Sequence, residues 1–80
     1  MKPELKIGLY RHFKGSLYQV TSLARHSETE EWMVVYHPLH SPDNVWVRPL
    51  DMFLEMVLAP DSDSEVPRFK PVQDDDDLMA

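Results

Sequence analysis

Apolar and polar residues alternate along most of the first half of the chain, a pattern typical of β-strands that bury one face. Strands are predicted at residues 8–13, 17–26, 32–39 and 45–49. The cluster "KGS" predicts a tight turn after the first strand, because Gly15 is free to adopt a positive φ. The third segment, "WMVVYHPL", is almost continuously apolar, which predicts burial on both faces or an interface.

The pattern changes after the fourth strand. Apolar residues then repeat at the spacing of one helical face, which predicts one or two helical turns capping the sheet: Leu50, Phe53, Leu54 and Val57. Residues 59–67 have the Pro, Ser and Asp content of a linker. Residues 68–72 are expected to return as an edge strand, and the acidic residues 73–80 are expected to be disordered.

This element order predicts a mainly β fold, and we favour a small SH3-like antiparallel barrel of four to five strands with one short helix. The alternative is an open, twisted antiparallel sheet with one helix across it. We expect one domain over residues 1–72, with an ordered core at about 8–58 and the edge strand at 68–72, followed by the tail.

The composition limits both the core and the cellular location. A chain of 80 residues builds a thin core, and without cysteine it has neither disulfides nor a thiolate metal site to support it. No apolar run approaches the roughly 20 residues of a membrane span. The start "MKPELKIGLY" lacks the apolar stretch of a signal peptide. We therefore expect a soluble, cytoplasmic protein that does not bind membranes.

The net charge of −6 is unevenly distributed. Residues 1–48 carry six basic and five acidic side chains, whereas residues 49–80 carry two basic and nine acidic ones. The first part is therefore nearly neutral. This weakens the argument against nucleic-acid binding without supplying a basic patch that would favour it.

Residue types that carry catalysis or bind metals occur without the spacing that such sites need. Of the four histidines, only His37 and His40 are close in sequence, and Pro38 lies between them. The chain has no nucleophile elbow and no glycine-rich phosphate loop. Glu28, close to His26, is expected in an exposed loop. We predict no catalytic residues, no metal ligands and no cofactor, and we consider an enzyme less favoured than a binding protein.

Two Arg-His pairs, Arg11–His12 and Arg25–His26, stand at the ends of predicted strands. The hairpins imply three cross-strand pairs: His12 with Tyr18, Arg25 with Trp32, and His26 with the Glu31 carboxylate. One interpretation is structural, with Arg25 lying across the indole and each pair simply ending a hairpin. The other is a ligand site.

Trp46 and Arg48 alternate with Val45 and Val47 in "NVWVRP". If the valines face the core, the tryptophan and the arginine stand together on the outside. Both residue types are enriched at interface hot spots. The alternative is that Trp46 lies under the helix that contains Phe53.

The motifs "YRHFKG", "ARHSET", "VVY", "WVRP" and "VPRF" resemble a bacterial family of unknown function, domain of unknown function 1653, over about residues 8–69. The resemblance implies a small β-rich protein. It also implies a polar signature at Arg11, His12, Lys14, Arg25, His26, Ser27, Glu28, Thr29, Trp46, Arg48 and Pro49. The loop "HPLHSPDN" stands where many members have a glycine-containing loop.

The preferred hypothesis is a non-enzymatic binding module that acts as a monomer or weak homodimer. Its ligand-binding residues would be Arg11, His12, Arg25, His26, Trp46 and Arg48. The partner would be a protein, a peptide or a small polar ligand. The first alternative is a hydrolase or metal-binding protein that uses histidine and glutamate. The second is a weak RNA or nucleotide binder masked by the acidic tail.

Overall fold

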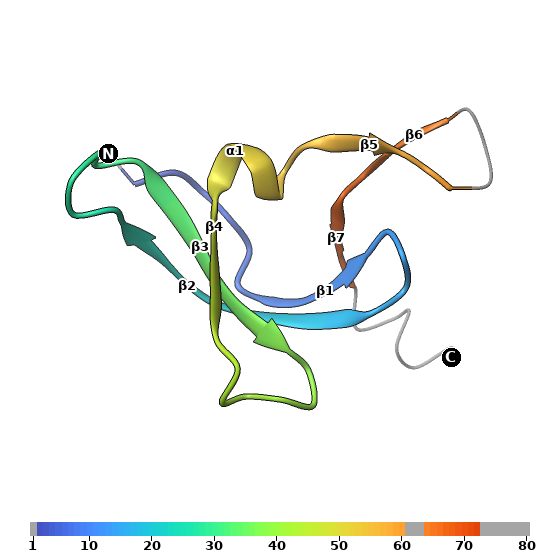
Figure 1. Cartoon of the computed structure of the whole chain (residues 1–80), viewed down its shortest axis with the longest axis horizontal. Coiled ribbons are helices and arrows are strands. Elements are labelled where there is room, and N and C mark those ends of the chain that lie inside the picture. Colours follow the sequence, from blue (N-terminus) through green and yellow to red (C-terminus); the bar gives the residue numbers. More distant parts are fainter. Residues whose placement is uncertain (1, 61–63, 73–80) are drawn as a thin grey trace.

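The computed structural model describes residues 2–60 and 64–72, which contain seven strands and one short helix (Figure 1). The elements are β1 Gly8–His12, β2 Leu17–Arg25, β3 Trp32–Pro38, β4 Trp46–Pro49, α1 Leu50–Phe53, β5 Met56–Leu58, β6 Glu65–Pro67 and β7 Phe69–Pro71. Five strands form one antiparallel sheet in the order β4-β3-β2-β1-β7, and β5 pairs with β6 in a separate hairpin. The mainly β fold is thus confirmed, and β7 supplies the edge strand at the end of the described chain.

The sheet is open, so the closed barrel that we favoured is wrong and the alternative open sheet is confirmed. Within the described residues, β4 and β7 are the two edges of the sheet. Both are short and both end in proline, Pro49 and Pro71, which has no N–H to donate to a neighbouring strand. Phe53 of α1 packs against this open sheet and is fully buried.

The core is an aromatic cluster on one side of this sheet. The Phe53 ring stacks on Phe69 at a centroid distance of 4.2 Å, and it meets Tyr10 and Tyr36 edge to face at 5.3 and 5.6 Å. Edge-to-face and stacked arrangements are the favourable geometries for aromatic pairs. The helix therefore matters mainly because it carries one large ring onto the core-facing side of the sheet.

A β-bulge in β2 between Val20 and Ser22 decides which side chains reach that core. Val20 pairs with Tyr36, but after the bulge Leu23 pairs with Val34, so Leu23 turns inward and Ser22 is exposed. Strict alternation places Ser22, not Leu23, on the side of Val20. Arg25 lies opposite Trp32, so the predicted pairing of these two residues is confirmed.

The region after β4 differs from the prediction in two ways. The helix has only four residues. Leu54 follows it and is half exposed, and Val57 belongs to β5, where it pairs with Val66. The predicted linker instead contains the loop and second strand of the β5–β6 hairpin. The strands β5 and β6 are only three residues long and carry no alternation signal, so composition alone indicated a linker. No helix in the described part of the chain is long and apolar enough to cross a membrane.

Candidate binding surface

The aromatic core extends to the molecular surface at the end of the sheet where β1 turns into β2. The half-buried Tyr18 ring lies 5.6 Å from the Tyr36 ring and 5.5 Å from the Phe69 ring, measured between centroids. His12 meets the Phe69 ring edge to face at 5.0 Å and lies 6.1 Å from Tyr18. Strands β1, β2, β3 and β7 therefore contribute adjacent rings to one continuous cluster, in which Tyr36 and Phe69 are buried and His12 and Tyr18 are partly exposed.

Strand β4 adds an arginine and a tryptophan to this side of the sheet. Trp46 pairs with Tyr36 and Arg48 with Val34, and directly paired residues point to the same side. The Arg48 Nε donates a hydrogen bond to the Tyr36 hydroxyl at 3.3 Å, and Trp46 remains 51% exposed. The condition that the valines face the core is not met, because Val45 and Val47 are 56% and 58% exposed. Tryptophan and arginine stand together, but on the core-facing side of the sheet.

His12 lies in a positively charged environment. Burial lowers the pKa of His12 below its usual value of 6.5, and the positive charges of Arg68, Lys14 and Arg48 lower it further. The Nδ1 atom of His12 accepts a hydrogen bond from the Lys14 N–H at 3.2 Å, which requires that nitrogen to be unprotonated. A neutral imidazole thus stands among cations that come from different elements.

Arg68 lies between β6 and β7 and is partly buried. Its Nη2 donates to the Glu55 carboxylate at 2.7 Å, while its Nε is buried without a hydrogen-bond partner. We call the set His12, Tyr18, Trp46, Arg48 and Arg68 the basic aromatic surface. The sequence analysis missed Tyr18 and Arg68 as site residues. The signal for Arg68 was its position in "VPRF", which suggested only an edge strand.

The structure divides the six predicted site residues among three places. His12, Trp46 and Arg48 belong to the basic aromatic surface. Arg11 points to the other side of the sheet, since it alternates with His12 along β1; its Nη1 donates to the Gly15 carbonyl at 3.3 Å. Arg25 and His26 lie at the far end of β2, next to the β2–β3 turn.

Arg25 and His26 have structural partners at that turn. The Arg25 guanidinium lies 4.5 Å above the Trp32 ring, as the predicted pairing requires. The His26 N–H donates to the Glu31 carbonyl, and His26 Nδ1 accepts from the main-chain N–H groups of Glu28 and Thr29. The expected contact between His26 and the Glu31 carboxylate is replaced by these main-chain bonds.

The register of the first hairpin differs by two residues from the expected one. Tyr18 pairs with Tyr10, not with His12. The turn lies one residue earlier than expected: the His12 N–H donates to the Ser16 carbonyl, and the Gly15 N–H donates to the His12 carbonyl. A shift of two residues keeps every side chain on its side of the sheet, so the His12 and Tyr18 rings remain neighbours.

The described residues contain no group of three or more His, Cys, Asp or Glu side chains arranged to hold a metal ion. His26 Nδ1 is bonded to the Glu28 N–H, so this ring nitrogen is already used in the turn. The basic aromatic surface offers cations, exposed ring faces and a neutral imidazole. These groups suit the binding of an anion that also carries a flat or apolar part.

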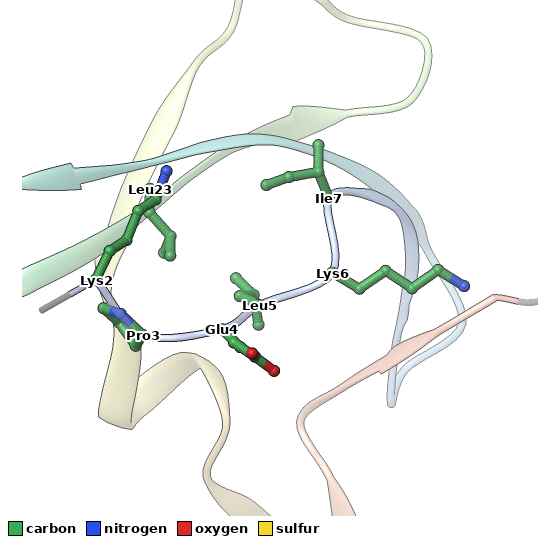
Figure 2. Close-up of a pocket in the computed structure, with 7 residues that line it drawn as sticks. All are labelled: Lys2, Pro3, Glu4, Leu5, Lys6, Ile7 and Leu23. Atoms are coloured by element: carbon green, nitrogen blue, oxygen red, sulfur yellow. The ribbon is translucent and has the colours of Figure 1, made fainter.

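Apart from the basic aromatic surface, a hollow lies under the N-terminal segment, residues 2–7, and has a volume of about 540 Å³. Figure 2 shows Leu5, Ile7 and Leu23 around this space, with the Lys6 side chain directed away from it. The Tyr10 hydroxyl donates to the Lys6 carbonyl at 2.7 Å, which ties the segment to the core. None of the six predicted site residues lines this hollow.

These features define a small open-sheet β protein with an aromatic surface that carries arginine. The sequence profile of the protein of unknown function DUF1653 matches residues 8–71, so the chain belongs to the DUF1653 family and the resemblance is confirmed. It is similar to a DUF1653 protein from Bordetella bronchiseptica with a known crystal structure. The two share 35% identity at a TM-score of 0.74, over 86% of this chain and 88% of that one. No curated protein matches the chain.

Proposed function

We propose that the protein is a non-enzymatic binding module whose basic aromatic surface holds an acidic segment of a partner protein. The observation that carries the proposal is the convergence of Arg48, Trp46, Tyr18 and His12 from three strands of one sheet, β4, β2 and β1. Arginine and tryptophan are the residue types that most often dominate binding energies at protein interfaces. In keeping with a chain that contains no cysteine, we place the module in the cytoplasm.

The balance of charges supports an acidic ligand. The two ion pairs among the described residues involve Arg25 and Arg68, whereas Arg48 bonds to a tyrosine hydroxyl. A carboxylate that reaches Arg48 would make a charge-assisted hydrogen bond, and these bonds are about twice as strong as neutral ones. The exposed Trp46 ring offers an apolar contact beside that charge.

A protein segment is favoured over nucleic acid as the ligand. The described residues contain eight basic and eight acidic side chains, so they carry no excess positive charge. Non-specific nucleic-acid binding depends on neutralising many phosphates with lysine and arginine. A local cluster of cations on a neutral body suits one or two carboxylates better than a polyanion.

The test is a proton–nitrogen NMR titration of the full chain with a short acetylated peptide that holds two glutamates beside a phenylalanine. The same peptide with glutamines in place of the glutamates is the ligand control. We expect shifts to cluster on His12, Tyr18, Trp46 and Arg48 with the acidic peptide only. Equal shifts with both peptides, or shifts elsewhere, would contradict the proposal.

A pair of variants separates a specific contact from general electrostatics. Arg48→Gln should weaken binding of the acidic peptide about ten- to a hundredfold, since a hydrogen bond to a charged group contributes about 1.5–3 kcal/mol. Lys6→Gln removes the same charge from a side chain outside the surface and should leave affinity nearly unchanged. Equal losses in the two variants would contradict a site at Arg48, provided that thermal unfolding shows both to be folded.

A further inference from the structure

Exposed apolar side chains are concentrated in one part of the chain. The described residues include eight large hydrophobic side chains that are exposed, and seven of them lie within residues 45–58. These seven are Val45, Trp46, Val47, Met52, Leu54, Met56 and Leu58. Single exposed apolar residues are ordinary, but a run of them in one segment marks an interaction surface.

Three consecutive members of this group, Val45, Trp46 and Val47, lie on or beside β4, an edge strand of the five-stranded sheet. Natural proteins usually protect such edges with charged side chains, prolines or covering elements, because the free backbone groups pair readily with another strand. Here Arg48 and Pro49 occupy the last two positions of the edge, whereas Val45, Trp46 and Val47 before them are apolar and exposed.

We propose that two copies of the chain join along β4, antiparallel and related by a two-fold axis at Val47, which makes one continuous ten-stranded sheet. The argument for a second copy is that the strand is complementary to itself. With Val47 opposite the partner's Val47, Trp46 stands opposite Arg48 of the partner subunit, and the same pair forms again on the other side of the axis. A two-fold interface doubles every favourable contact in this way.

The pair formed by Trp46 and Arg48 of the partner subunit is chemically favourable. Directly opposite residues on antiparallel strands lie close enough for their side chains to touch. A guanidinium placed over an indole face is a favourable cation–π contact. Arg48 bonds to the Tyr36 hydroxyl, and Trp46 has half its surface exposed, so both have groups available for such a pair.

The dimer goes beyond the proposed function and would change it in one respect. Trp46 and Arg48 both belong to the basic aromatic surface, so the partner's Trp46 would stand beside that surface of each copy. Two acidic segments could then bind side by side on one sheet. Self-association and peptide binding are nevertheless tested by different measurements, so either proposal can be contradicted without the other.

The absence of cysteine from the chain allows a direct test by cross-linking. In Val47→Cys the two introduced thiols face each other across the axis, at a separation that suits a disulfide. We expect most of this variant to become a covalent dimer on mild oxidation. Leu58→Cys, at an exposed apolar position on β5, is the matched control and should cross-link far more slowly. Equal rates for the two variants would overturn the proposal.

Sedimentation of the unmodified full chain over a concentration series provides the second readout. We expect a reversible shift from monomer to dimer, abolished by Val47→Lys and retained by Leu58→Lys. A monomer at every concentration up to about 1 mM would overturn the dimer, since such an affinity corresponds to only about 4 kcal/mol. Val47→Lys should still bind the acidic peptide, so failure of the dimer leaves the proposed function open to its own test.

Discussion

At the scale of single residues, the two Arg-His pairs share a structural role that explains their position at strand ends. Each histidine uses Nδ1 to accept main-chain N–H groups of the turn that follows: Lys14 for His12, and Glu28 and Thr29 for His26. Asparagine and aspartate side chains make the same kind of bond in turns. At the second pair this structural role is the main one, because Arg25 and His26 have partners within their own hairpin.

The turn role of His26 gives a first prediction at this scale. His26→Ala removes the acceptor of two N–H groups in a turn where Glu30 adopts a left-handed φ of 64°. We expect it to lower the free energy of unfolding by about 0.5–1.5 kcal/mol, measured by urea denaturation. His26→Asn places an oxygen near the Nδ1 position and should keep most of the stability. Equal losses in the two variants would show that the ring itself matters more than its bonds.

His12 gives a prediction about pH. Its pKa is lowered in the folded protein by burial and then by Arg68, Lys14 and Arg48, whereas in the unfolded chain it stays near 6.5. The unfolded state therefore binds more protons as the pH falls through this range, so His12 makes the folded state less stable in acid.

The measurement is urea unfolding of the wild type and of His12→Asn at pH 7.5 and 5.5. The free energy of unfolding should fall less in the variant, since asparagine does not titrate yet still offers an acceptor to Lys14. An equal fall in both proteins would assign the pH dependence to other groups.

At the scale of elements, the pattern of apolar residues and turn formers was enough to locate the first four strands and the pairing of Arg25 with Trp32. Strands that bury one face carry a strong period-two pattern, and the loops between them are rich in turn formers. The end positions of these strands agree with the structure within one residue. This part of the fold is encoded locally, so a single sequence discloses it.

The sequence pattern did not predict the bulge, the β5–β6 hairpin or the full set of residues in the basic aromatic surface. A bulge at Thr21 changes which residues face inward, and its cause is a tertiary fit that no local pattern reports. The spacing from Leu50 correctly predicted a helical turn. Within that turn only Phe53 is buried, because the chain leaves the core after it. Arg68 reaches His12 only through the β1–β7 pairing, which joins distant parts of the chain.

At the scale of the whole molecule, the charges divide between the part that the structure describes and the remaining residues. The eight basic and eight acidic side chains of the described part cancel. The other six acidic residues, which account for the net charge of −6, are Asp61, Asp63 and Asp74–Asp77. The expected disordered tail, residues 73–80, lies outside the described residues. The acidity of the protein thus says little about the surface that we propose as the binding site.

The acidic run gives the last prediction. The described chain ends at Val72, whose N–H donates to the Leu9 carbonyl, so removing residues 73–80 keeps every bond of β7 to β1. We therefore expect the truncated chain to unfold at nearly the same temperature as the full chain. If the four aspartates come within reach of the basic aromatic surface, they repel an acidic ligand, and at 0.1 M salt such repulsion reaches about 10 Å.

Truncation should therefore strengthen binding of the acidic peptide a few fold at low salt, and the gain should disappear at about 0.5 M salt because the charges are screened. The matched control is the full chain with Asp74–Asp77 replaced by asparagine, which keeps the length and removes the charge. If this control behaves like the truncated chain, the effect is electrostatic. If neither variant changes the affinity at low salt, the acidic run does not act on the basic aromatic surface, and the neutral body alone determines what that surface binds.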